Sequence, residues 1–198
     1  MCMETFLRLP EEKRTRFLDA AWEEFTRVSF AESSINQIVR RAGIPRGSFY
    51  QYFRDKEDLF AYLMAQVRDY FVEQYTDVLR EAEGDIFRTQ LLCFARFTRR
   101  EPGPDAMFEK FWQVLRLNPG LHMQMFLGEQ TRRELPETLM QAADLSAFRS
   151  EETARSAFFL SLLALSAAVM DVLNTPGEAE TFRCQLEQRL DIIRRGSL

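Results

Sequence analysis

One short stretch of the chain is basic, although the protein as a whole is acidic. Residues 33–56 hold five basic side chains and one acidic side chain, a net charge of +4, in a chain whose net charge is −4, so the remainder carries −8. The basic residues are Arg40, Arg41, Arg46, Arg54 and Lys56. Such a cluster attracts phosphate groups and indicates a nucleic-acid interface, the alternative being a solvated surface without a partner.

Residues suited to catalysis or metal binding are sparse. His122 is the only histidine, and no serine, histidine and aspartate set or paired-histidine spacing surrounds it. We therefore expect no catalytic residue, no metal site and no cofactor. The three cysteines, Cys2, Cys93 and Cys184, give neither a disulfide framework nor a paired ligand spacing, which favours the cytoplasm.

Export and membrane insertion are not expected either. The first residues mix glutamates with apolar side chains and lack the basic-then-apolar order of a signal peptide. The longest uncharged run, Ser156 to Met170, is 15 residues, shorter than the roughly 20 needed to cross a bilayer. We predict a cytoplasmic protein with no membrane partner.

Three predicted helices contain or support the basic stretch. The first covers about residues 10–28, where apolar side chains recur every three or four positions. The second covers about residues 34–43: Ser34 and Gln37 have the spacing of a capping box, and a glycine ends the helix. The third covers residues 46–53. Two short helices joined by a glycine-containing turn, braced by a longer helix, form a helix-turn-helix whose second helix fits the DNA major groove.

The rest of the chain also has helical patterns. Asp55 is a suitable N-cap for a long helix over about residues 56–83. Further helices are predicted near residues 85–100, 105–117, 120–133, 137–147, 150–174 and 178–195. We predict an all-α fold of about nine helices. The expected domains are a helix-turn-helix DNA-binding domain over residues 1–55 and a helical effector-binding and dimerisation domain over residues 56–198.

Four sequence segments carry a specific resemblance. They are FLDAAWEEF from Phe17, SSINQIV from Ser33, AGIPRGSFYQYF from Ala42 and DKE from Asp55. Over about residues 10–60 the chain resembles the DNA-binding module of TetR-family (TetR/AcrR-like) transcriptional regulators. It departs from the family at two positions: Ser29 stands where a glycine is common, and Pro45 stands where a capping serine or threonine is common.

The resemblance implies which residues contact DNA. Arg46 would bind guanine or a phosphate, Gln51 would read adenine, and Gly47 would let the backbone approach the groove. Lys56 and the start of the second helix would bind phosphates. For Tyr50 and Tyr52, partial burial in the core is the alternative. The implied DNA-binding residues are Ser33, Ser34, Asn36, Arg46, Gly47, Ser48, Tyr50, Gln51, Tyr52 and Lys56.

The middle of the chain is rich in aromatic and methionine residues, which suit a cavity for a small apolar effector. Ordinary core packing is the alternative for each of them, and for His122 a structural or surface role. The candidate ligand-binding residues are Phe94, Phe97, Met107, Phe108, Phe111, Trp112, His122 and Phe126.

The functional expectation is a homodimeric transcriptional repressor that a small apolar ligand releases from a near-palindromic operator. The resemblance implies that the last two helices of each subunit form the dimer interface. One rival is a helical small-molecule carrier or enzyme without a DNA role. Another keeps DNA binding but makes the protein an activator or a ligand-independent regulator.

Overall fold

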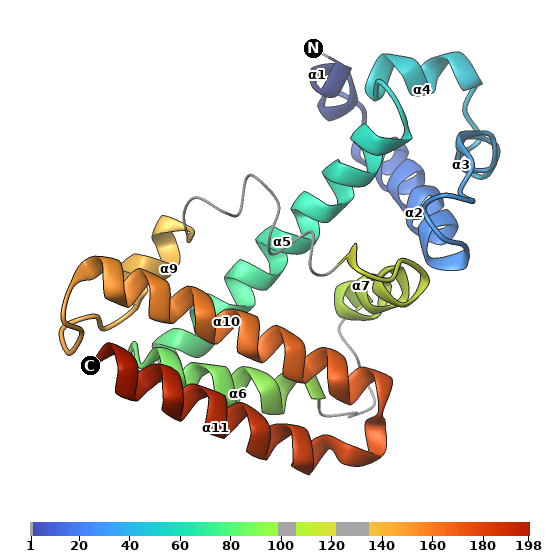
Figure 1. Ribbon diagram of the computed structural model, residues 1–198. Coiled ribbons are helices and arrows are strands. Elements are labelled where there is room, and N and C mark those ends of the chain that lie inside the picture. Colours follow the sequence, from blue (N-terminus) through green and yellow to red (C-terminus); the bar gives the residue numbers. More distant parts are fainter. Residues whose placement is uncertain (1, 99–105, 122–134) are drawn as a thin grey trace. The chain divides into compact units, whose positions relative to one another are not determined.

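In the computed structural model, residues 2–98, 106–121 and 135–198 are described (Figure 1). Within these ranges the chain forms ten α-helices, one short 3-10 helix and no strand, so the all-α prediction is confirmed. The described residues pack into two compact units. The first takes its residues from ranges 1–70 and 103–124, and the second from ranges 71–102 and 125–198.

The first unit contains the helix-turn-helix. Its helix α2 packs against α3 and α7, and α4 packs against α1 and α3. The helices are α1 (Cys2–Leu7), α2 (Glu11–Arg27), α3 (Ile35–Ala42), α4 (Arg46–Tyr52), the first part of α5 (Lys56–Glu81) and α7 (Ala106–Leu117). The observed α2, α3 and α4 lie within one or two residues of the predicted helices. Asp55 caps α5 as predicted, since its Oδ1 accepts from the Asp58 backbone N–H at 2.7 Å.

Aromatic side chains form the core of the first unit. Phe6, Phe17 and Phe53 are each almost fully buried, and the Phe17 and Phe53 rings stack with centroids 5.8 Å apart. The Phe6 ring lies 5.6 Å from Phe17 and 5.7 Å from Tyr62. Phe6 belongs to α1, a helix that the sequence patterns did not predict. This short helix therefore supplies a central core residue of the first unit.

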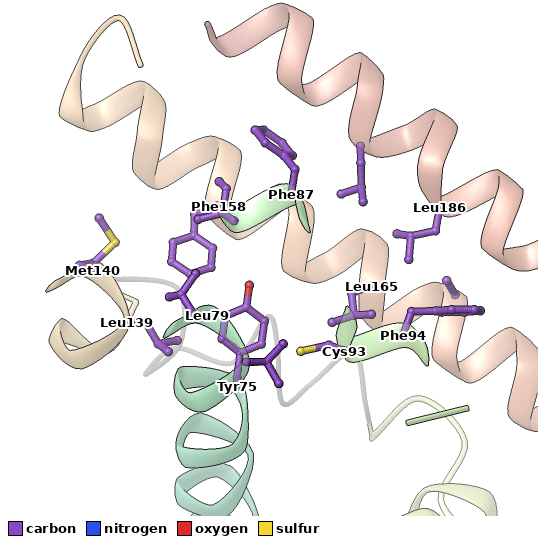
Figure 2. Packing of buried hydrophobic residues seen from close by; sticks show 14 of the residues in the cluster. Tyr75, Leu79, Phe87, Cys93, Phe94, Leu139, Met140, Phe158, Leu165 and Leu186 are labelled. Carbon is purple, nitrogen blue, oxygen red and sulfur yellow. The ribbon is translucent and has the colours of Figure 1, made fainter. Parts of the chain in front are cut away.

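The second unit is built around three helices that run side by side (Figure 1): α10 packs against both α6 and α11. Its helices are the last part of α5, α6 (Ile86–Thr98), α9 (Glu137–Ala142), α10 (Glu151–Asn174), the 3-10 helix η1 (Pro176–Glu178) and α11 (Ala179–Ser197). Figure 2 shows its apolar core, in which Leu79, Phe94, Phe158, Leu165 and Leu186 are almost fully buried.

The helix predicted over residues 137–147 was too long, because α9 ends at Ala142. After it, the Asp144 carboxylate accepts from the Ser146 backbone N–H at 3.0 Å, and the Asp144 N–H donates to the Gly84 carbonyl at 3.0 Å. These bonds replace helical ones. They also require Gly84, whose φ is +82° and whose added Cβ would lie 2.5 Å from the Asp144 nitrogen. The helix predicted over residues 120–133 falls mostly outside the described residues.

Among the described residues, α10 alone is long and apolar enough, by length and composition, to cross a membrane. Core helices of water-soluble proteins meet the same criterion. About a third of that stretch, 33%, is buried within the chain, and its contacts with α6 and α11 account for that burial.

The contribution of α1 can be measured by removing its buried ring. We expect Phe6→Ala to lower the free energy of unfolding by about 3–5 kcal/mol, because it removes a fully buried phenylalanine and leaves a cavity. Urea unfolding followed by circular dichroism measures this loss. Leu7→Ala is the matched control: Leu7 is 52% exposed, so its truncation should change stability by less than about 0.5 kcal/mol. Equal effects would contradict the core role of Phe6.

Candidate nucleic-acid interface

The turn between α3 and α4 depends on Gly43. Its φ of +66° and ψ of +34° are left-handed, and an added Cβ would meet no atom within 4 Å, so conformation rather than space selects glycine here. The Ile44 backbone N–H donates to the Val39 carbonyl at 3.0 Å and closes the end of α3. Pro45, extended at φ −61° and ψ 144°, then starts α4. The turn is therefore fixed by local backbone geometry.

A buried carboxylate joins α2 to α3. The Glu24 side chain has no exposed surface, and its Oε2 lies 2.6 Å from Arg41 Nη1 and 2.8 Å from Arg27 Nη2. Its Oε1 accepts from the Ser34 backbone N–H at 3.0 Å. Burial raises the pKa of Glu24, but the hydrogen bonds from Arg27, Arg41 and Ser34 together lower it by more. The pKa of Glu24 therefore lies below its ordinary value. Glu24 is therefore ionised and holds both ends of α3.

The capping box predicted at Ser34 and Gln37 was wrong in its bonding, although Ser34 is the N-cap residue of α3. Its hydroxyl makes no capping hydrogen bond. In a capping box, the side chain three residues later accepts from the N-cap backbone N–H. Here Glu24 accepts that N–H, so a residue of another helix replaces Gln37.

The loop between α2 and α3 is also held by α5 and α7. The Lys56 ammonium donates to the carbonyls of Phe30 at 2.6 Å and Ser33 at 3.0 Å, and lies 4.5 Å from the centre of the Phe30 ring. The Phe30 backbone N–H donates to Oδ1 of Asn118, just beyond α7, at 2.8 Å. These contacts join residues 26 and 88 positions apart, a separation that no spacing in the sequence predicts.

Helix α4 has one buried face and one exposed face. Phe49 is fully buried against Phe17 and Phe53. Arg46, Gly47, Tyr50 and Gln51 are exposed, and Ser48 is half-buried. Tyr50 is 45% exposed, and its hydroxyl accepts from Arg46 Nη2 at 3.5 Å. The exposed face thus brings together the residues predicted to read bases.

The other predicted DNA-binding residues have mixed environments. Tyr52 is half-buried, with its ring 5.8 Å from Phe6, so it packs as the alternative reading allowed. Ser33 is buried, and its hydroxyl donates to the Phe30 carbonyl at 2.7 Å. Asn36 is exposed at the start of α3. The structure gives Ser33 and Lys56 positioning roles, and their contacts with phosphate stay predictions.

The candidate effector residues divide between the two units. Phe94 is buried in the core of the second unit, and the Phe97 ring lies 5.6 Å from Phe71. The α7 residues Met107, Phe108, Phe111 and Trp112 are half-buried in the first unit. His122 and Phe126 lie outside the described residues. The structure thus accounts for Phe94 as core, and a ligand site at the whole set stays a prediction.

The described residues were also compared with the requirements of a metal site and of a reactive cysteine. Within the described ranges, no group of three or more His, Cys, Asp or Glu residues could hold a metal ion. Cys93 is fully buried, as expected of a small apolar residue, and burial raises the pKa of its thiol to about 12. That thiol is protonated at neutral pH and is a poor nucleophile.

Comparison with known proteins finds similarity in the part of the chain that contains α2, α3 and α4. Residues 17–63 match the family model described as bacterial regulatory proteins, tetR family. The chain is 32% identical over 88 residues to the HTH-type transcriptional regulator HbdR of Aromatoleum sp. (strain CIB), covering 44% of this chain and 37% of HbdR. It is 28% identical over 146 residues to the HTH-type transcriptional regulator BetI of Escherichia coli O45:K1, covering 66% of this chain and 74% of BetI.

Most of these matches are partial. The alignments span only 24% to 38% of the length of four curated relatives. Among solved structures, a TetR family transcriptional regulator from Chloroflexus aurantiacus J-10-FL aligns over 98% of this chain and 97% of its own, with 25% identity and a TM-score of 0.47.

The role of Glu24 is testable through pH. We expect Glu24→Gln to lower the free energy of unfolding at pH 7 by about 1–3 kcal/mol, because the negative charge between Arg27 and Arg41 is lost and an NH2 group replaces one of the two acceptor oxygens. A lowered pKa stabilises the fold above the ordinary value of 4.5 and stops doing so as pH falls through the folded pKa. The difference between native chain and variant should therefore shrink below about pH 4.5.

Urea unfolding measured between pH 7 and pH 3 gives these differences. Glu23→Gln is the matched control, because the Glu23 side chain is 62% exposed and pairs with the same Arg41 at 3.0 Å. It should change stability by less than about 0.5 kcal/mol. A pH-independent deficit in Glu24→Gln would show that its charge is not the stabilising feature.

Proposed function

We propose that the chain is a member of the tetR family of bacterial regulatory proteins, whose model its residues 17–63 match, and that it is a sequence-specific DNA-binding transcriptional regulator acting in the cytoplasm. The observation that carries this proposal is the exposed face of α4. It presents a guanidinium, an amide, a hydroxyl and an uncovered backbone at Gly47, the groups that read base edges and phosphates in the major groove.

We assign the proposed DNA contacts of each residue from the exposure of its side chain. Arg46 and Gln51 read bases, because both are exposed on α4 and can bond bidentately to guanine and adenine. Asn36 and Tyr50 contact the backbone, where they fix the register of the protein on DNA. Ser33, Ser34, Ser48, Tyr52 and Lys56 complete the proposed DNA-binding set, with Lys56 also holding the loop that leads into α3.

A two-fold operator calls for a dimer, in which each subunit inserts one α4 into successive major grooves. Large apolar side chains on the last two helices support an interface there. Leu160 on α10 is 50% exposed and Ile192 on α11 is 71% exposed. We propose that a second copy of the chain covers these residues and that the operator is near-palindromic.

The proposed switch is a small apolar effector, and the proposed outcome is release of a repressor from its operator. A ligand can act only by binding one conformation more tightly than another. Contacts within the first unit connect α5 and α7 to the proposed DNA-binding face, because Lys56 and Asn118 hold the loop before α3. Displacing either helix changes that loop.

DNA recognition can be tested by sequence selection from genomic fragments at controlled salt, using the full chain. We expect recovery of an inverted repeat, and binding that is weakened about ten- to a hundredfold in Arg46→Ala through loss of a bidentate base contact. Arg68→Ala is the control. It removes one charge from α5, where Arg68 is exposed and pairs with Asp69 at 3.0 Å, and it should leave operator affinity nearly unchanged.

Only diffuse binding that disappears with rising salt, equally in both variants, would contradict a sequence-specific regulator. Once an operator is known, a reporter gene placed behind it separates repression from activation.

The dimer can be tested by placing a charge on the proposed interface. Ile192→Asp should shift the sedimentation of the chain from dimer toward monomer and weaken operator binding, because a buried unpaired carboxylate opposes association. Leu7→Asp is the control, since Leu7 is 52% exposed on α1 in the other unit. Unchanged sedimentation of Ile192→Asp as a dimer would place the interface elsewhere.

A further inference from the structure

An amide is buried in the apolar core of the second unit. Gln90, on α6, has no exposed surface, and its Nε2 lies 2.8 Å from the Tyr75 hydroxyl and 2.7 Å from Ser161 Oγ. Tyr75 comes from α5 and Ser161 from α10, so the three side chains, here called the Gln90 cluster, join three helices. Figure 2 shows the Tyr75 hydroxyl pointing into the core among apolar side chains.

The orientation of the amide follows from the protons available. A serine hydroxyl has one proton, and Ser161 donates it to the Phe158 carbonyl at 2.7 Å. Ser161 Oγ then accepts from Gln90, and the amide nitrogen is the atom that faces it. Both protons of that nitrogen are then used, one by Ser161 and one by Tyr75.

The carbonyl oxygen of Gln90 consequently accepts no hydrogen bond from this cluster. In the described part of the chain, Gln90 Oε1 is the one buried side-chain nitrogen or oxygen without a hydrogen-bond partner. Other buried polar groups nearby are satisfied: the Thr89 hydroxyl, for example, donates to the Asp85 carbonyl at 2.7 Å. A buried acceptor without a donor is destabilising, so the fold tolerates a specific local penalty at this position.

The surroundings select what kind of donor fits. Burial raises the pKa of Tyr75 well above its ordinary value and the pKa of Cys93 to about 12, so both groups are neutral. Arg96, on the same helix, is exposed and pairs with Glu81 at 3.2 Å. A charged group brought beside Gln90 would lose its hydration without gaining a counter-ion. The donor must therefore be neutral.

We propose that the Gln90 cluster is the polar anchor of the effector site, and that the effector is an apolar molecule with one neutral hydrogen-bond donor, such as a hydroxyl or an N–H, which donates to Gln90 Oε1. This inference rests on the proposed ligand response and adds the chemical class of the ligand. An ordered water fits less well, because a buried water typically needs two to four polar partners and the cluster sits in an apolar core.

Two probes of nearly equal shape test the donor requirement. 1-Naphthol carries a hydroxyl where 1-methylnaphthalene carries a methyl group, and the methyl compound is the more hydrophobic. Isothermal titration of each probe into the full chain at pH 7, without DNA, gives both dissociation constants. We expect 1-naphthol to bind at least about tenfold more tightly, as expected for satisfying one buried acceptor.

Variants of Gln90 assign that preference. Gln90→Met keeps the length of the side chain and removes the acceptor, so the tenfold preference should fall to within about twofold. Gln90→Leu is a second variant in case the first does not fold, as judged by circular dichroism. Thr89→Val is the matched control on the same helix: Thr89 is also fully buried, but its hydroxyl bonds within α6, so the preference should be retained.

The outcomes are decisive in both directions. A hydroxyl preference that is lost in Gln90→Met and kept in Thr89→Val supports the anchor. Equal binding of the two probes, a preference that survives in both Gln90 variants, or no saturable binding of either probe overturns it. A crystal structure with 1-naphthol that shows only a water on Gln90 Oε1 also overturns it. Because no DNA is present, failure here leaves the operator selection unaffected, and loss of operator recognition leaves this result standing.

Discussion

The carboxylate of Glu24 has no contact with water, so its charge must be balanced entirely by the groups that touch it. Those groups lie at both ends of α3: the Ser34 backbone N–H at its start and the Arg41 guanidinium near its end. Moving α3 relative to α2 would leave a buried charge without partners. The position of α3, and through the short Gly43 turn the position of α4, therefore follows from one electrostatic requirement.

The same loop is held from two further directions within the first unit. Lys56 bonds its carbonyls from the start of α5, and Asn118 bonds the Phe30 N–H from the end of α7. A lysine ammonium bonded to carbonyls is a positional restraint as much as a charge. This makes the electrostatic surface of residues 33–56 weaker than the sequence count suggests, since Arg41 and Lys56 are engaged internally and Arg54 lies 3.6 Å from Asp58. The exposed Arg46 gains importance accordingly.

Local signals predicted most helix boundaries, whereas partners distant in sequence were not predictable. Gly43 and Asp55 act on their neighbours, so they marked the end of α3 and the start of α5 correctly. Phe6 gave no such signal: α1 has six residues, too short to be stable alone, and is held by packing of its ring against other helices. Likewise Glu24 finds its partners 10 and 17 residues away, which no spacing rule covers.

The functional residues divide in the same way. The family resemblance named Arg46, Gly47, Tyr50 and Gln51, and the structure exposes all four on α4. Their contacts with DNA stay predictions. Residue type alone could not distinguish aromatic residues that bind an effector from those that pack in the core, because both roles use the same apolar side chains. Phe94, for example, is 3% exposed and packs in the core.

The two buried polar clusters, one in each unit, differ in a way that bears on function. Glu24 is fully satisfied: each of its oxygens accepts hydrogen bonds from neighbours, and these bonds fix α3 against α2. The amide of Gln90 donates twice and has no donor to its oxygen among the described residues. Nearly all buried polar groups in native proteins are hydrogen-bonded, and functional sites are among the places where exceptions occur. Gln90 Oε1 lies between α5, α6 and α10, so a ligand that donates to it stabilises the conformation in which the donor reaches the oxygen. A ligand shifts an equilibrium only by such a difference in its affinity for two conformations.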